Sequence, residues 1–109
     1  MSATDLKIAR RLSGTERQRL LAEHRLWEQV AERGAIRRSF RFSDFAEAFG
    51  FMSAVAITAE GMDHHPEWSN VHGRVEILLS THDVEGLSQR DVALAQRIDA
   101  LALLFGAGL

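Results

Sequence analysis

The sequence predicts an α+β fold in which three helices cover one face of a four-stranded antiparallel sheet. Two pairs of segments carry alternating apolar residues, and each pair is joined at a glycine, as in a β-hairpin. Three further segments carry apolar residues at helical spacing, and the order along the chain is helix, strand, strand, helix, strand, strand, helix. Hairpins joined across a helix favour a single sheet with helices on one side, a two-layer architecture.

The composition suits one globular domain. Of the 109 residues, 46% are hydrophobic and 26% are charged. The chain has no cysteine, which excludes disulfides and thiolate metal ligands and gives no reason to expect secretion. A net charge of −2 predicts no strong attraction to nucleic acid. The charged N-terminus is unlike a signal peptide, and no apolar run approaches the ~18 residues of a membrane span. We therefore expect a cytoplasmic protein with neither nucleic acid nor membrane as a partner.

The N-terminal residues 1–12 are expected to form a mobile or weakly docked arm, followed by a single domain over residues 13–109. Ser13 begins this domain, and Glu16 follows three residues later, which is the spacing of a capping box. We therefore expect a short helix from Ser13 to about His24.

A first hairpin is predicted after this helix. The residues alternate over 26–32 and 35–42, and the pattern breaks at Gly34, so two antiparallel strands should meet at a glycine turn. Arg37 and Arg38 are neighbours in the second strand, where adjacent side chains point to opposite faces. They do not form a phosphate-binding patch, and we expect both to be solvated at the surface.

The central helix is expected to begin at Ser43 as its cap, with Asp44 in the first turn, and to end near Gly61. Its predicted apolar stripe consists of Phe45, Phe49, Met52 and Ala56, with Ala48 and Val55 beside them.

The second hairpin should turn at Gly73, and Ser88 should open a last helix that runs to about Phe105. The longer strand of the hairpin places Val75, Ile77 and Leu79 on one face. The inner stripe of the last helix is predicted to be Val92, Ala95, Ile98, Ala102 and Phe105. The C-terminal stretch is apolar nearly all round, which suggests a subunit interface.

Three histidines and one acid are candidates for chemistry. His64 and His65 enter the second hairpin, and His82 leaves it. Because an antiparallel hairpin returns the chain to its starting point, His82 can come back near the pair. Asp91, in the first turn of the last helix, can reach the same place. Imidazole titrates near neutral pH, so such a cluster suits acid–base catalysis.

Other readings of these residues stay open. His64 and His65 alone are also typical of surface histidines in a turn. Ser88 and Asp91 have the spacing of a capping box, so the acid has a structural reason to be present. Three histidines and an aspartate also suit zinc or iron. Neither His-x-His nor His-x-x-x-His occurs, however, so metal is the less favoured alternative.

Three segments, taken in order, resemble a known family: EGMDHHPEW from Glu60, STHD from Ser80 and GLSQRD from Gly86. Trp27 and the stretch FRFSDFAEAFGFM from Phe40 add to the likeness. With these motifs, nearly all of the chain after Ser13 is similar to the pterin-4a-carbinolamine dehydratase family.

The resemblance implies a fold, an activity and partners. Members have a four-stranded antiparallel sheet with helices on one side and form homodimers or homotetramers. They dehydrate 4a-hydroxytetrahydropterin to quinonoid dihydropterin, which recycles tetrahydrobiopterin for aromatic amino acid hydroxylases and requires neither a metal nor a cofactor. Animal members also act as dimerisation cofactors of a transcription regulator through their helical surface, which is the alternative function.

The resemblance also implies roles for individual residues. His64, His65, His82 and Asp91 correspond to the catalytic residues. We expect His64 and His82 to exchange protons with the substrate, His65 to orient the ring, and Asp91 to hold the tautomer of His82 or polarise the site. The residues expected to bind the substrate are Glu60, Asp63, Pro66, Ser80, Thr81 and Asp83. His72 stands where the family usually has an aromatic residue, which predicts a more polar rim.

Overall fold

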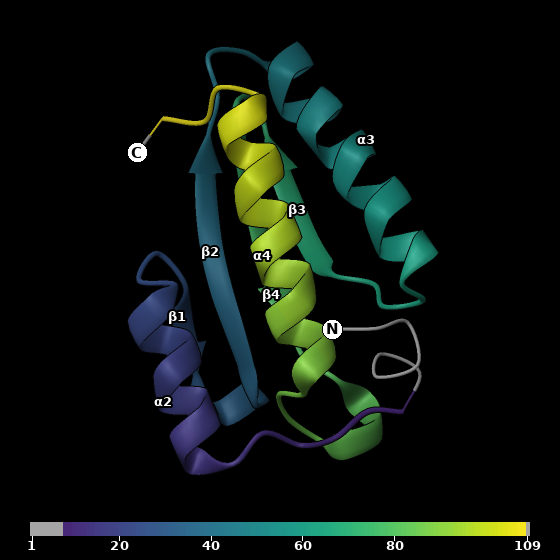
Figure 1. Cartoon of the computed structure of the whole chain (residues 1–109). Coiled ribbons are helices and arrows are strands. Elements are labelled where there is room, and N and C mark those ends of the chain that lie inside the picture. Colours follow the sequence, from purple (N-terminus) through teal and green to yellow (C-terminus); the bar gives the residue numbers. More distant parts are fainter. Residues whose placement is uncertain (1–7, 109) are drawn as a thin grey trace.

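The computed structural model describes residues 8–108 and confirms the α+β architecture (Figure 1). The four strands are antiparallel and lie in the order β1-β2-β4-β3. They are β1 (Glu28–Val30), β2 (Ala35–Arg41), β3 (Glu67–Val71) and β4 (Arg74–Leu79). The helices are α2 (Gly14–Glu23), α3 (Phe45–Gly61) and α4 (Gln89–Leu104), with short 3₁₀ helices η1 (Ala31–Arg33) and η2 (His82–Val84). No helix within the described range is long and apolar enough to cross a membrane.

The core lies between the sheet and the helices. Ile36 pairs with Leu79 and Phe40 with Val75, so these buried side chains of β2 and β4 share one face. Helix α4 crosses in front of these strands, with α3 beside it (Figure 1). Phe51 of α3 packs on Phe40, and their ring centroids are 5.0 Å apart. Large buried rings of this kind contribute much of the hydrophobic stabilisation of a small domain.

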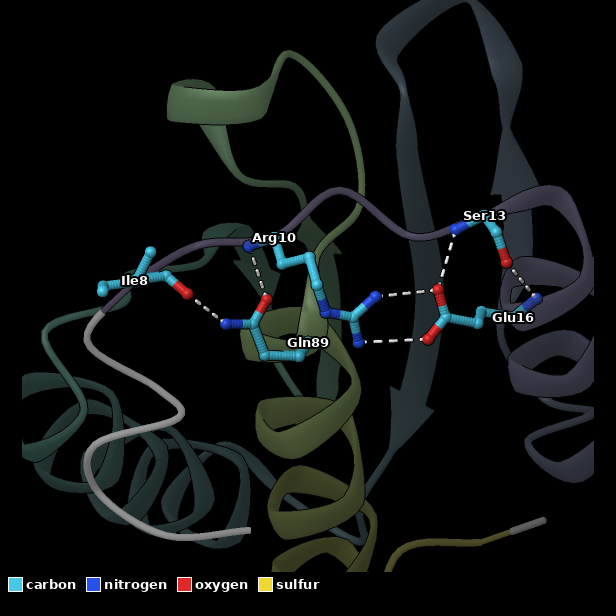
Figure 2. Close-up of polar contacts among 5 residues, drawn as sticks. All are labelled: Ile8, Arg10, Ser13, Glu16 and Gln89. Atoms are coloured by element: carbon cyan, nitrogen blue, oxygen red, sulfur yellow. Dashed lines mark hydrogen bonds and ion pairs between the residues drawn. The ribbon is translucent and has the colours of Figure 1, made fainter.

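The predicted capping box begins α2. Ser13 Oγ accepts a hydrogen bond from the backbone N of Glu16 at 3.1 Å, and Glu16 Oε1 accepts one from the backbone N of Ser13 at 2.9 Å. Arg10 donates to both oxygens of the same carboxylate, at 2.9 and 3.1 Å (Figure 2). The hydrogen bond from Arg10, followed by that from the backbone of Ser13, lowers the pKa of Glu16 from its ordinary 4.5 to about 2.

The first hairpin differs from the prediction at its turn. Strand β1 stops at Val30, and the chain continues as η1, which ends at Gly34 in a left-handed conformation with φ of 59°. A Cβ at Gly34 would lie 3.1 Å from the Cα of Gly86. This close approach, together with the positive φ, favours glycine at the turn.

Helix α3 buries a different stripe from the predicted one. Its cap is Asp44 rather than Ser43, because the Asp44 side chain accepts a hydrogen bond from the backbone N of Glu47 at 2.8 Å. Phe45 and Phe49 of the predicted stripe are 54% and 57% exposed. The buried stripe is Ala48, Phe51, Val55 and Ala59. Both stripes have helical spacing, and contact with the sheet selects the one that carries Phe51.

Arg38 is buried, contrary to the expectation of a solvated arginine. Its side chain is 8% exposed, stacks on the Phe40 ring at 4.3 Å and donates to Asp99 of α4 at 2.6 Å. The Trp27 indole donates to the same Asp99 oxygen at 2.9 Å. Asp99 thus compensates the buried guanidinium, since a buried charge without a partner costs several kcal/mol.

The described part of the expected arm is docked. The backbone N of Leu12 donates to Leu87 at 2.9 Å, and Arg11 forms an antiparallel bridge with Ser88. The Gln89 side chain spans the arm, accepting from the backbone N of Arg10 at 2.7 Å and donating to the carbonyl of Ile8 (Figure 2). Residues 1–7 of the expected arm lie outside the described residues.

The Glu16 ion pair predicts a pH-dependent part of the stability. A carboxyl with a lowered pKa in the fold stabilises above its unfolded pKa, and this contribution disappears as the pH falls from about 4.5 to about 2. Gln at this position retains the capping hydrogen bonds but has no charge. We therefore expect Glu16→Gln to be less stable than the unaltered protein at pH 7 and nearly equal to it at pH 2.

Urea unfolding at both pH values measures this difference. Glu23→Gln is the matched control, because Glu23 is on the same helix and has no ion pair among the described residues. A difference between Glu16→Gln and the unaltered protein that stays constant with pH would contradict the prediction.

Candidate functional site

The end of α3 sets the position of the two adjacent histidines. Gly61 ends the helix as predicted, but the left-handed residue is Asp63, with φ of 51°. The backbone N of Asp63 donates to Glu60, and that of His64 donates to Ala59, at 3.1 and 3.0 Å. These two bonds form a Schellman motif, which turns the chain sharply and fixes the backbone of His64. Pro66 cannot donate a backbone hydrogen bond, and β3 begins directly after it.

His64 and Asp91 form a buried pair. His64 Nε2 lies 2.7 Å from Asp91 Oδ1, and the two side chains are 7% and 0% exposed. Asp91 Oδ2 accepts from Thr81 Oγ1 at 2.7 Å and from the backbone N of Ser88 at 2.9 Å. Because an ionised carboxylate only accepts hydrogen bonds, His64 donates its Nε2 proton. The neutral ring is then left with Nδ1 to accept a proton.

This arrangement corrects the expected role of Asp91. We expected it to orient His82, but its imidazole partner is His64. The capping box of Ser88 and Asp91 is confirmed, so the acid stabilises the start of α4 and contacts His64 at the same time. The hydroxyl of Thr81 is also buried and engaged, with Asp91 on one side and Ser88 Oγ at 2.7 Å on the other.

The remaining histidines of the site are exposed. His65 Nε2 lies 2.7 Å from Glu60 Oε1 of the last turn of α3, and both side chains face solvent. His82 begins η2 just after β4 and is exposed as well. The polarity of the three imidazoles therefore differs, with one buried against a carboxylate and two open to water.

A cavity of about 440 Å³ lies between the segments before β3 and after β4. All the predicted site residues line it except Glu60, which reaches it through His65, and Asp91, which lies behind His64. Glu67 and Arg90 line the cavity too and were missed. A cation in the first turn of a helix opposes the helix dipole, so Arg90 beside Ser88 was a usable signal. Nothing in the local pattern distinguishes Glu67.

The described residues contain no group of three or more His, Asp or Glu side chains arranged to hold a metal ion. The imidazoles instead have separate partners, with His64 bound to Asp91 and His65 to Glu60. The geometry therefore suits proton transfer by individual imidazoles more than shared coordination.

Comparison with known proteins decides the family. The sequence model of the family described as pterin 4 alpha carbinolamine dehydratase matches residues 10–101. The chain belongs to this family. Two bacterial relatives are named putative pterin-4-alpha-carbinolamine dehydratase, a type of hydro-lyase. The one from Rhodopseudomonas palustris is 52% identical over 99 residues, covering 91% of this chain and 98% of its own. The one from Burkholderia multivorans is 53% identical over 95 residues, covering 87% and 93%.

Solved structures agree with this family assignment. A Brucella melitensis protein described as transcriptional coactivator/pterin dehydratase has a TM-score of 0.82 and 43% identity, covering 85% of this chain and 99% of its own. A pterin dehydratase-like protein identified as a RuBisCO assembly factor in the α-carboxysome has a TM-score of 0.61 and 26% identity, covering 70% and 88%. The pterin dehydratase fold thus occurs in proteins described with different roles.

The buried hydrogen bonds around Asp91 predict a stability effect. Thr81→Val keeps the shape of the side chain but removes the donor to Asp91 Oδ2. An under-satisfied buried carboxylate costs about 1–3 kcal/mol, so we expect the free energy of unfolding to fall by that amount.

Urea unfolding of this variant beside Ser80→Ala measures the loss. Ser80 is the preceding residue, is half-buried and forms no side-chain hydrogen bond within the described residues, so its variant should stay close to the unaltered protein. Equal stability of the two variants would show that the Thr81 hydroxyl does not support Asp91.

Proposed function

We propose that this protein dehydrates 4a-hydroxytetrahydropterin to quinonoid dihydropterin by histidine acid–base catalysis, without a metal or cofactor. Family membership gives the reaction class. The observation that carries the mechanism is the buried His64–Asp91 pair at a cavity that His82 also lines. We place the reaction in the cytoplasm, in tetrahydrobiopterin recycling beside an aromatic amino acid hydroxylase.

The reaction requires two proton transfers. The proton on N5 leaves, its electron pair forms the C4a–N5 double bond, and the C4a–O bond breaks. The hydroxyl must gain a proton to depart as water. Two positioned imidazoles can serve these steps, and each contributes roughly 10²–10⁴-fold to the rate.

His64 suits removal of the N5 proton. Its Nε2 is engaged by Asp91, which leaves Nδ1 as the acceptor. When His64 takes up the proton, the adjacent carboxylate stabilises the resulting imidazolium. His82 is exposed and can exchange protons with water, so we assign it the protonation of the leaving hydroxyl. His65, paired with Glu60 at the rim, orients the ring.

Histidine variants test this assignment. Because each transfer depends on its own imidazole, we expect His64→Ala and His82→Ala to lower kcat by about 10²–10⁴-fold each. His65→Ala should raise KM more than it lowers kcat, since this residue binds rather than transfers protons. Stopped-flow dehydration of 4a-hydroxytetrahydropterin measures both constants.

The matched control is His72→Asn, at the tip of the second hairpin. Asn tolerates the left-handed conformation of His72, which has φ of 51°, and the position lies at the far end of β4 from His82. Unchanged turnover in the His64 and His82 variants would remove the catalytic role from this site.

We propose protein contacts on the helical surface as a second role. Exposed apolar side chains occupy the outer face of α3, at Phe45, Phe49 and Ile57, and the end of α4, at Leu103 and Leu104. Exposed apolar groups of this kind often mark association sites. They support a homodimer or homotetramer, or binding of a transcription regulator as its dimerisation cofactor, as the Brucella protein's description as a coactivator also suggests.

Charge on α3 separates these contacts from catalysis. We expect Phe45→Glu with Phe49→Glu to lower the mass measured by sedimentation velocity and to leave dehydration unchanged, because buried carboxylates oppose association. Leu26→Glu is the control, because Leu26 is as exposed as Phe45 but lies before β1. A monomeric unaltered protein at micromolar concentration would refute self-association.

A further inference from the structure

A second cavity adjoins the site described above. It has a volume of about 420 Å³ and shares Ser80, Thr81 and His82 with the first cavity, so these residues form the boundary between the two. The turn that ends at Gly34 packs closely against Gly86 and closes one side. The cavity is therefore part of the fold rather than a gap left by a loop.

Charged side chains surround this second cavity. Arg11 of the docked arm extends along Gly86, and its guanidinium forms no hydrogen bond or ion pair with any described residue. Glu32 and Glu85 add carboxylates to the lining. Donors and acceptors thus lie on opposite sides of one small volume.

An ion pair links the two cavities. Arg33 lines the second cavity, Glu67 lines the first, and their side chains are 2.6 Å apart. Both are half exposed, so the pair is a weak contact at the surface and does not seal one cavity from the other.

The chemistry of the substrate connects the two spaces. In a pterin, N5 is bonded to both C4a and C6, so a group that acts at N5 or at the C4a hydroxyl lies next to the C6 substituent. His82 has this role in the proposed mechanism, and it borders both cavities. A ring held in the first cavity can therefore direct its C6 side chain past His82 into the second.

We propose that the second cavity binds the C6 side chain of the pterin substrate and favours side chains that carry hydroxyl groups. The guanidinium of Arg11 donates to a hydroxyl oxygen, and the carboxylates of Glu32 and Glu85 accept from hydroxyl protons. This inference rests on the proposed dehydratase function and adds a substrate class to it: pterins with a polyol at C6.

Two substrates and two variants test the proposal. The substrates are 4a-hydroxytetrahydropterins with a methyl or a dihydroxypropyl group at C6. Arg11→Met removes the donor and keeps the length of the side chain, while Ala31→Phe fills the cavity from η1 without changing any charge. Arg41→Met, an exposed arginine at the opposite end of β2, is the control.

We expect both variants to lower kcat/KM for the dihydroxypropyl substrate by about 3- to 10-fold relative to the methyl substrate, as loss of a hydrogen bond to a charged group implies. The control should keep the ratio of the unaltered protein. Equal effects on both substrates, or no effect on either, would overturn the C6 assignment while leaving the dehydratase function intact. If the unaltered protein dehydrates neither substrate, the dehydratase proposal itself fails, and this inference falls with it.

Discussion

The carboxylate of Asp91 joins three parts of the chain that are distant in sequence. It contacts His64 after α3, Thr81 after β4 and the backbone of Ser88 at the start of α4. A buried carboxylate is costly unless hydrogen bonds compensate it, and here donors reach both oxygens. The contacts that hold the first turn of α4 therefore also hold the imidazole, so the position of His64 depends on the packing of the whole fold.

Local signals in the sequence were sufficient for most of the fold. The caps at Ser13 and Ser88 involve residues three positions apart, so their spacing alone predicts them. The burial of Arg38 was not predictable in this way, because its partner Asp99 is 61 residues away. Helix α3 has two apolar stripes, and only tertiary contact determines that Phe51 rather than Phe49 faces the sheet.

The candidate site was predicted as a group more reliably than in its pairings. Hairpin closure brings His82 back toward His64, and the two line one cavity. Which imidazole meets Asp91 depends on the Schellman turn after α3 and on η2, and neither leaves a distinct pattern in the sequence. The second cavity was also beyond local reasoning, because it needs the arm at Arg11 to lie beside the turn at Gly34.

The docked arm has a consequence for the order of folding during synthesis. Residues 8–12 leave the ribosome first, yet their partners Leu87, Ser88 and Gln89 are made nearly last. A nascent chain can form its first hairpin early, but the arm has no place to bind until α4 begins to emerge. The same late segment brings Asp91, so an incomplete chain carries all three site histidines without the acid that orients one of them. Release of the finished chain, rather than synthesis of the histidines, therefore sets the moment at which the site is assembled.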